Sequence, residues 1–311
     1  MKLVADIGGT NSRLAVAKAD GPDTGTIRSF RNSEFGSFDE TLETYLSEFN
    51  DYQLTHIVIA VAGPVRGKNA RLTNLDWEIT GHKLSQRFQT PKVEIINDLT
   101  ALGHSVSNLR PEQLSTLVAG TKHPDRNGQS LVVGIGTGFN VSPVIQIGDQ
   151  VICPSVEAGH TSMPTLVARR MDNFVEGLSE QFPTIEHCFS GRGLQKFFDQ
   201  VLPHNDKDAA SLVASYGQTG FEKITVAIDR YVELLAYLLR DLSLSYLPTD
   251  GIFLAGGVAR SILSTPAAKR CIPVLRQLSQ FHIDQIPVWI IADDTAALTG
   301  CAQLAGACTY K

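Results

Sequence analysis

The sequence predicts an α/β protein with two duplicated halves. Short runs of apolar, β-branched residues recur along the chain, and helical patterns lie between them. These runs are apolar on both faces, which is typical of strands covered by helices on both sides. Two segments about 128 positions apart, "DIGGTNSRLAV" (6–16) and "GIGTGFNVSPV" (134–144), both consist of an apolar strand, a Gly/Thr turn and a second strand. This similarity indicates that each half begins with a β-hairpin.

The strands and helices can be assigned along the chain. Ser37 and Glu40 have the spacing of a capping box in front of a helix. The longest helical pattern runs from Lys223 to about Tyr246, and its apolar stripe predicts a scaffold helix in the core. The final pattern, "DDTAALTGCAQLAGA", predicts a helix that returns to the first half. The expected strands lie at 2–8, 56–63, 93–97, 130–136, 251–257 and 287–292.

Composition excludes several classes of protein. The 311 residues are 43% hydrophobic and 19% charged, so the chain can bury a sizeable core. A net charge of -5 gives no broad basic field for nucleic acid or an anionic membrane. No window approaches 18 consecutive apolar residues, and the five cysteines are scattered without zinc-site spacing. We therefore expect a cytoplasmic protein with reduced thiols and with no nucleic-acid or membrane partner.

The glycine-rich turns suggest phosphate binding, because glycine lets backbone N–H groups approach an anion closely. The stretch "GPVRGKNA" lacks the spacing and the Ser/Thr of a P-loop, and "GIGTGF" continues into a strand where a dinucleotide fingerprint needs a helix. A phosphate held in a hairpin turn fits better. Asp6, at the end of a strand beside the first turn, could orient a hydrated Mg²⁺. A lone glycine turn is often an ordinary hairpin, but the second turn and the later "LAGGVARS" favour a nucleotide site.

A second group of polar residues suggests a site for a polyol. Asn97 and Asp98 end the strand in "KVEIINDLTALGHS", and a carboxylate at a strand end accepts a hydroxyl proton well. Glu157 and His160 lie in "SVEAGHTS", and Glu186 lies in "TIEHCFSG". Each has an ordinary alternative: Asn-Asp as a helix cap, His as a surface or core residue, Glu-x-x-His as a helical surface pair. Together with the phosphate turns, they indicate a site that binds several hydroxyls.

The motifs along this chain, taken in their order, resemble those of the bacterial glucokinase family over essentially the whole length of the chain. The resemblance implies a two-lobed actin-like (ribonuclease H-like) ATPase fold with duplicated mixed sheets and a central cleft. Its small lobe would comprise residues 1–108 plus 294–311, and its large lobe residues 109–293. The matching stretches are "DIGGTNSRLAV", "AVAGPV", "LTNLDW", "EIINDLTA", "GIGTGF", "EAGH", "SGRGL" and "LAGGVARS".

The resemblance also assigns roles to residues. Asp98 would be the catalytic base, and Asp6 would hold Mg²⁺ through a water molecule. The expected ligands of the sugar hydroxyls are Asn97, Asp98, Glu157, His160 and Glu186. The expected nucleotide-binding residues are Asp6, Ile7, Gly8, Gly9, Thr10 and Asn11 in the first turn, Gly136, Thr137 and Gly138 in the second, and Gly256 and Gly257 near the adenosine.

These roles imply an ATP- and Mg²⁺-dependent glucokinase that phosphorylates the 6-hydroxyl of glucose, the first step of glycolysis, and forms a homodimer. The open alternatives are a kinase of another hexose, a non-catalytic sugar sensor of the same fold, and an actin-like ATPase or assembly protein. A sensor would not need Asp98, and an actin-like ATPase would not need the hydroxyl ligands. ADP release that depends on sugar would separate the last alternative from a kinase.

The sequence departs from the family pattern at two places. After "GTG" the family continues with a small or aliphatic residue and Gly, whereas this chain has Phe139 and Asn140. Before the histidine the family has Pro-x-Glu-Gly-Gly-His, whereas Val156 and Ala158 flank Glu157 here. The polar ligand positions are all retained, so these departures bear on sugar preference and turnover more than on the type of reaction.

Overall fold

The computed structural model describes residues 1–72, 75–120, 126–277 and 285–306. The chain divides into two compact units, a first unit of Met1–Leu109 with Asp293–Lys311 and a second unit of Arg110–Ala292. The lobe boundaries expected from the sequence differ from these by one residue at each junction. Among the described residues, no helix is long and apolar enough to cross a membrane.

The first unit contains a mixed sheet with the strand order β3-β2-β1-β5-β9, in which β4 also pairs with β2. Strands β1 and β2 form an antiparallel hairpin, and β1, β5 and β9 run parallel. The segment between β5 and β9 forms a separate small antiparallel sheet of order β6-β7-β8. The strands of this unit are β1 (Lys2–Ile7), β2 (Asn11–Lys18), β3 (Gly21–Pro22), β4 (Arg28–Arg31), β5 (His56–Val61), β6 (Val65–Arg66), β7 (Asn69–Arg71), β8 (Glu78–Thr80) and β9 (Val93–Asn97).

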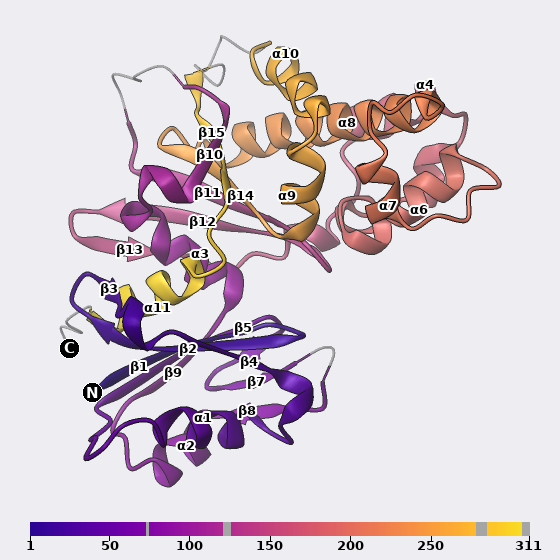
Figure 1. Cartoon of the computed structure of the whole chain (residues 1–311). Helices are drawn as coiled ribbons and strands as arrows, with labels where there is room; N and C mark the ends of the chain where they lie inside the picture. The colour runs from indigo at the N-terminus through magenta and orange to yellow at the C-terminus, as the bar shows by residue number, and fades with distance from the viewer. Residues whose placement is uncertain (73–74, 121–125, 278–284, 307–311) are drawn as a thin grey trace. The chain divides into compact units, whose positions relative to one another are not determined.

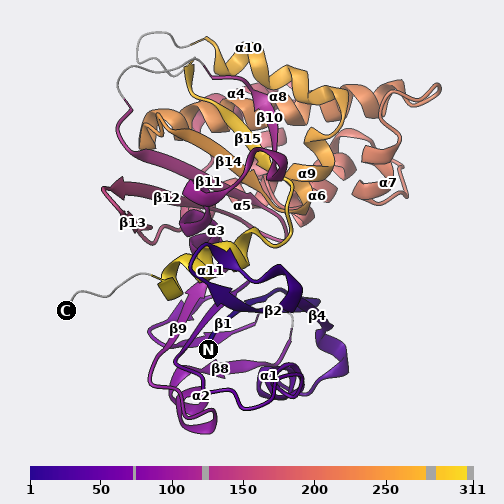
Figure 2. The ribbon, with the colours of Figure 1, turned by 60° about the vertical axis from the view of Figure 1, so that its left-hand side comes forward.

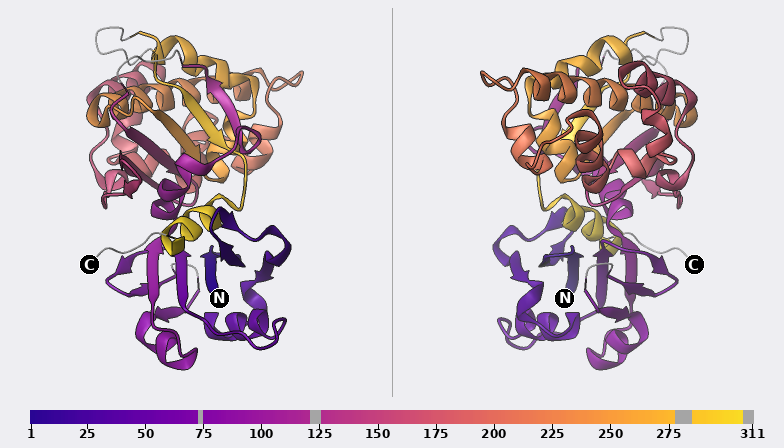
Figure 3. Two further views of the ribbon diagram at one scale, coloured as in Figure 1. Left: turned by 90° about the vertical axis from the view of Figure 1, so that its left-hand side faces the viewer. Right: turned by 90° about the vertical axis from the view of Figure 1, so that its right-hand side faces the viewer.

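Helices cover both faces of this sheet, as Figures 1 and 3 show. Alternate residues of β1 point to opposite faces: Leu3 packs in a core cluster with Phe38 of α1, and Val4 packs in another with Leu298 of α11. This arrangement explains why the strand is apolar at nearly every position. The helices of the unit are α1 (Phe38–Leu46), α2 (Gly81–Arg87), α3 (Asp98–Ser105) and α11 (Ala296–Gly306).

The second unit repeats this design. Strands β11 and β12 form an antiparallel hairpin, and β11, β14 and β15 run parallel within a sheet of order β10-β15-β14-β11-β12-β13. Both units therefore contain a hairpin followed by two parallel strands, which confirms the expected duplicated mixed sheets. The strands are β10 (Leu114–Val118), β11 (Gln129–Ile135), β12 (Phe139–Ile147), β13 (Gln150–Ile152), β14 (Gly251–Ala255) and β15 (Val288–Ile291).

The helices of the second unit pack around α8, whose residues Ile228, Tyr231 and Leu235 are fully or almost fully buried. Helices α4 and α10 both contact α8, which lies close to each of them in Figure 2. The helices are α4 (Thr165–Phe174), α5 (Ile185–Cys188), α6 (Gly191–Val201), α7 (Ala209–Ala214), α8 (Glu222–Tyr246), α9 (Gly257–Leu263) and α10 (Cys271–Leu275). Short 3₁₀ turns lie at Thr24–Thr26, Asn32–Glu34, Val106–Asn108, Pro111–Gln113, Ala158–His160, Leu178–Gln181 and Pro266–Arg270.

The expected strands and the long helix are all present, with ends shifted by no more than two residues. One detail of the capping prediction is wrong. Ser37 caps α1 as expected, since its side chain accepts a hydrogen bond from the Glu40 N–H at 3.3 Å. The Glu40 carboxylate, however, accepts from the N–H of Gly36 at 2.8 Å and not from that of Ser37, so the reciprocal half of the capping box is shifted by one residue.

Gly300 allows α11 to lie very close to α3. A Cβ atom at this position would stand 1.7 Å from the carbonyl oxygen of Ala101 and 3.1 Å from the amide nitrogen of Ser105. Both are backbone atoms, which cannot move aside as the end of a flexible side chain can. The close packing of these helices therefore depends on the missing side chain.

We expect Gly300→Ala to destabilise the protein by about 3 kcal/mol, because the added methyl group forces α11 away from α3. Gly306→Ala is the matched control, since it lies in the same helix and a Cβ there meets no atom within 4 Å. Urea unfolding should show a lower midpoint for Gly300→Ala and a free energy of unfolding within about 1 kcal/mol of the original for Gly306→Ala. Equal midpoints for the two variants would contradict this account of the packing.

Candidate functional site

In the first unit, the predicted residues gather where three parallel strands end. Ile7 of β1, Val61 of β5 and Asn97 of β9 stand in one row across the sheet. Asn97 also caps α3, because its Oδ1 accepts from the Leu99 N–H at 3.0 Å, while its Nδ2 donates to the Gly63 carbonyl at 3.3 Å. The helix-cap interpretation of Asn97 is thus correct, and the cap fixes the first turn of α3.

Asp98 is the first residue of α3 and is half-buried. One carboxylate oxygen accepts from the Leu99 N–H at 2.9 Å. Burial raises the pKa of Asp98 to about 6, and the hydrogen bond from Leu99 opposes this rise. A carboxyl group that titrates near neutral pH is suited to accept a proton from a hydroxyl.

Asp6, at the end of β1, has a second unusual carboxyl group. Burial and, to a smaller extent, the negative charges of Asp98 and Asp294 raise the pKa of Asp6 to about 7, while Arg13 opposes this rise. Arg13 lies 3.8 Å from Asp6 and also pairs with Asp294 at 3.6 Å. Its charge is therefore shared between two carboxylates. This surplus of negative charge fits a hydrated cation held by Asp6.

The first glycine turn joins β1 to β2 and is held by a buried asparagine. The Gly8 N–H donates to the Asn11 carbonyl at 2.9 Å and closes the turn. Asn32 donates from Nδ2 to the Gly8 carbonyl at 2.8 Å and accepts from the Ser12 hydroxyl at 2.7 Å. Asn32 was not among the residues predicted from the sequence, because it lies outside every recognisable motif.

Three glycine motifs meet at the second turn, which joins β11 to β12. The Gly136 carbonyl accepts from the N–H of Gly191 in "SGRGL" at 2.8 Å. Gly256 of "LAGG" adopts φ +97°, and a Cβ atom there would lie 2.3 Å from the Ile135 carbonyl oxygen. A residue with a side chain at 256 would be strained in its backbone and would also displace the turn. Gly136, Gly138 and Gly256 are thus brought together as expected.

Glu186 lies in α5 and faces this second turn. Its carboxylate accepts from the Phe139 N–H at 3.0 Å. A Cβ atom at Gly138 would stand 2.6 Å from the same carboxylate oxygen, so glycine leaves room for Glu186 beside the turn. The expected hydroxyl ligand and the expected phosphate turn are therefore neighbours in the second unit.

Glu157 and His160 are both exposed and are linked by one short 3₁₀ turn. The His160 N–H donates to the Glu157 carbonyl at 3.3 Å. Between them, Gly159 touches the start of β12, since a Cβ there would lie 2.1 Å from the Phe139 carbonyl oxygen. Asn140 of β12 donates from Nδ2 to the Glu157 carboxylate at 3.2 Å. The start of β12 thus contacts both Glu157 and Glu186.

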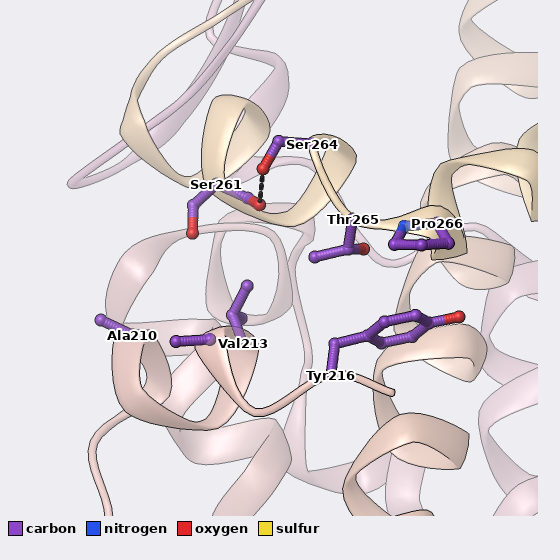
Figure 4. A pocket seen from close by; sticks show the side chains of 8 residues that line it. Ala210, Val213, Tyr216, Ser261, Ser264, Thr265 and Pro266 are labelled. Carbon is purple, nitrogen blue, oxygen red and sulfur yellow. Dashed lines mark hydrogen bonds between the residues drawn. The ribbon is translucent and has the colours of Figure 1, made fainter. Parts of the chain in front are cut away.

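A hollow of about 290 Å³ lies between α7 and the end of α9 in the same unit. In Figure 4, the Tyr216 ring lies below Pro266, and Ser261 and Ser264 lie opposite α7. The Ser264 hydroxyl donates to the Ser261 carbonyl at 2.8 Å. Because α9 begins at Gly257, this hollow lies at the other end of the helix that starts beside the second turn.

The predicted residues therefore form two groups in different units. The group in the first unit comprises Asp6, Ile7, Gly8, Gly9, Thr10, Asn11, Asn97 and Asp98. The group in the second unit comprises Gly136, Thr137, Gly138, Glu157, His160, Glu186, Gly256 and Gly257. The sequence did not identify the supporting asparagines: Asn32 was missed, and Asn140 was noted only as a departure from the family pattern.

Comparisons with known proteins identify the family of the chain. A family model described as Glucokinase matches residues 3–307. A glucokinase from Xanthomonas campestris pv. campestris (strain 8004) is 31% identical over 277 residues, covering 85% of this chain and 82% of the relative. One from Saccharophagus degradans is 26% identical over 314 residues and covers 96% of each chain.

The solved structure of a glucokinase from an Antarctic psychrotroph is similar with a TM-score of 0.81 and 26% identity, covering 97% of this chain and 98% of that one. This similarity confirms the actin-like fold class expected from the resemblance. Since the family model matches nearly the whole chain, this protein belongs to the glucokinase family of sugar kinases, phosphotransferases that act on a hydroxyl group.

Proposed function

We propose that this protein transfers the γ-phosphoryl group of ATP to the 6-hydroxyl of glucose, with Asp98 as the base. The observation that carries the proposal is the environment of Asp98. It begins α3 at the end of a buried strand, next to the Asn97 cap, and burial raises its pKa to about 6. Such a group is ionised at neutral pH and is basic enough to accept a hydroxyl proton during transfer.

Asp98 would accept the proton of the sugar hydroxyl as that oxygen attacks the phosphorus atom. The bond between the γ-phosphorus and its bridging oxygen breaks, and ADP leaves with that oxygen. Phosphoryl transfer needs little covalent chemistry from the protein, so the position of the base matters most. Asn97 supplies this position through its hydrogen bonds to Leu99 and Gly63.

Recognition of the sugar is assigned to Glu157, His160 and Glu186, with Asn97 as a further ligand. Carboxylate oxygens accept hydrogen bonds from hydroxyls, and several such acceptors define where each hydroxyl must lie. The two glutamates are already supported by donors at the start of β12. Their support limits the side-chain motion that would otherwise be lost on binding.

The glycine turns are assigned to the phosphates of ATP, and Asp6 to Mg²⁺ through a water molecule. The surplus negative charge at Asp6 and Asp98 supports this assignment. When bound, Mg²⁺ neutralises charge that develops on the phosphate oxygens. The hollow between α7 and α9 is the place we assign to the base of the nucleotide, because it lies along α9 from Gly257.

The preference for glucose over other hexoses, the homodimer and the cytoplasmic location stay predictions. A sugar sensor would bind the hexose without producing ADP, and an actin-like ATPase would produce ADP without a hexose. A coupled assay of ADP release with and without glucose tests the proposed reaction against both.

We expect Asp98→Asn to lower kcat for glucose by ~10²- to 10⁴-fold while KM for glucose changes only a few-fold, since the amide keeps hydrogen-bonding capacity but cannot take a proton. The same substitution at Asp20, an exposed residue of the same unit, is the control and should leave kcat unchanged. Near-normal turnover of the Asp98 variant would remove this residue from its role.

Asp98→Asn should also stabilise the fold at alkaline pH. The folded protein holds Asp98 with a pKa of about 6, above its ordinary value of 3.8, so ionising this group costs stability as pH rises from about 4 through 6. We expect the variant to unfold with a free energy about 1–3 kcal/mol higher than the original protein at pH 8, and with no difference at pH 4. Urea unfolding at the two pH values measures this, and a difference of the same size at both would contradict the raised pKa.

Removal of one sugar hydroxyl should weaken catalysis strongly. If Glu157, His160 and Glu186 each pair with a hydroxyl, an analogue without that hydroxyl leaves unpaired a polar group that the bound sugar covers, and kcat/KM should fall by up to ~10⁴-fold. Mannose moves a hydroxyl without deleting it and is expected as a secondary substrate. The measurement compares glucose, mannose, 2-deoxyglucose and 3-deoxyglucose. Use of all four within a few-fold would show that these residues do not read the hydroxyls separately.

A further inference from the structure

We propose that Asn140 is a positioning residue for sugar binding: its side-chain amide fixes the loop that presents Glu157 and so sets the affinity for the sugar. The inference rests on the proposed function in one respect, the assignment of Glu157 as a sugar ligand. The holding of the loop itself rests on contacts within the second unit.

All hydrogen-bonding positions of the Asn140 amide are used. Its Nδ2 donates to the Val156 carbonyl at 2.7 Å and to the Glu157 carboxylate at 3.2 Å. Its Oδ1 accepts from the N–H groups of Ala158 and Val141, each at 2.9 Å. An amide has two donor hydrogens and two acceptor lone pairs, so it is saturated here. The amide contacts Glu157, the residue before it and the residue after it.

The orientation of this amide has only one solution. Turning it over would place the NH₂ group against the N–H groups of Ala158 and Val141, where donors would meet donors, and would place the oxygen against the Val156 carbonyl. Aspartate has the same shape but lacks both donors, and glycine or alanine lacks all four contacts. Aspartate, glycine and alanine therefore cannot make the four hydrogen bonds that asparagine makes at this position.

Asn140 supports a loop that is only partly held by packing, because part of it lines a cavity. A cavity of about 340 Å³ is lined by Val156, Glu157 and Ala158 on one side and by Leu238 and Tyr246 of α8 on the other. Ala158 is buried in the core of the unit and Val156 packs against that core, but no packing supports the loop on the side that lines the cavity. By contrast, Asn140 is part of the β11–β12 ladder and is opposite Gly134, so it offers a rigid support.

Asn140 therefore orients the carboxylate of Glu157 before the sugar binds. Asn140 contacts Oε2 of Glu157, which leaves Oε1 to accept from a sugar hydroxyl. Without the asparagine, the loop and the side chain must both be ordered at the moment of binding, and that cost appears as weaker affinity. The sugar contact is present before and during the reaction alike, so the effect should fall on KM and leave kcat largely unchanged.

The test compares Asn140→Ala and Asn140→Asp with Gln146→Ala in the full-length protein. Gln146 lies on the same strand, and its side chain donates within the β12–β13 hairpin to the Gly148 carbonyl, away from the loop that carries Glu157. We expect KM for glucose to rise about tenfold for Asn140→Ala, the effect of one hydrogen bond to a charged group. The rise should be larger for Asn140→Asp, whose carboxylate would face the Val156 carbonyl and the Glu157 carboxylate. In both variants, kcat and KM for ATP should stay within about threefold. Gln146→Ala should match the original protein.

A double-mutant cycle with Glu157→Ala shows whether Asn140 acts through Glu157. If it does, adding Asn140→Ala to Glu157→Ala changes KM for glucose by no more than about twofold, because the carboxylate to be positioned is already absent. If the two effects multiply, Asn140 acts on the sugar by another route and the inference is overturned. An unchanged KM in Asn140→Ala overturns it as well.

Amide hydrogen exchange tests the positioning without any sugar chemistry. The Ala158 N–H donates to Asn140, so its exchange should become at least about tenfold faster in Asn140→Ala and stay unchanged in Gln146→Ala. If the original protein phosphorylates no hexose, the proposed function fails, and the exchange rate of Ala158 still decides whether Asn140 holds the loop. If the original protein is an active kinase and Asn140→Ala leaves both this exchange rate and KM unchanged, only the inference fails.

Discussion

The position of Asp98 at the junction between a buried strand and a helix is the constraint on which the first unit depends. The strand β9 brings the chain to this point, Asn97 caps the helix that leaves it, and Gly300 lets α11 support that helix from behind. The same burial that holds Asp98 in place disfavours its charge and raises its pKa. The burial that fixes this residue in place therefore also makes its carboxylate more basic. As a result, the folded protein is less stable when Asp98 is ionised than when it is protonated.

The two hairpin turns show how one local design is supported in two ways. In the first unit, the side chain of Asn32 holds the turn through the Gly8 carbonyl and the Ser12 hydroxyl. In the second unit, backbone groups support the turn, since Gly191 donates to Gly136 and Gly256 lies directly against Ile135. Close backbone approach requires glycine in the second case, whereas a side chain can bridge the gap in the first. The two units therefore share the sequence motif of the turn, but different groups support the turn in each unit.

Much of the fold followed from local sequence patterns, and the support of the site did not. Strand runs, the long helix and the placement of Asn97 and Asp98 at a strand end depend on residues within a few positions, which a pattern can reveal. Asn32 and Asn140 bond to residues 16 to 24 positions away, and these partners become neighbours only in the folded chain. No periodicity marks such contacts. The shift of the Glu40 partner to Gly36 has a different origin, because these residues are only four positions apart and the pattern does not specify which N–H the carboxylate reaches.

The carboxyl groups with proposed roles are set up differently in each unit. The carboxyl groups of the first unit, Asp6 and Asp98, both have pKa values raised by burial, and the charge of Asp98 also raises the pKa of Asp6. The carboxylates of the second unit, Glu157 and Glu186, are defined by hydrogen bonds from Asn140 and Phe139, two consecutive residues at the start of β12. These two donors form one of the two places at which the sequence departs from the family pattern. If Glu157 and Glu186 bind the sugar hydroxyls as proposed, a change at this dipeptide would alter sugar binding while the environment of Asp98 stays the same. Under the proposed roles, substrate preference could therefore diverge among related chains without any change in the base.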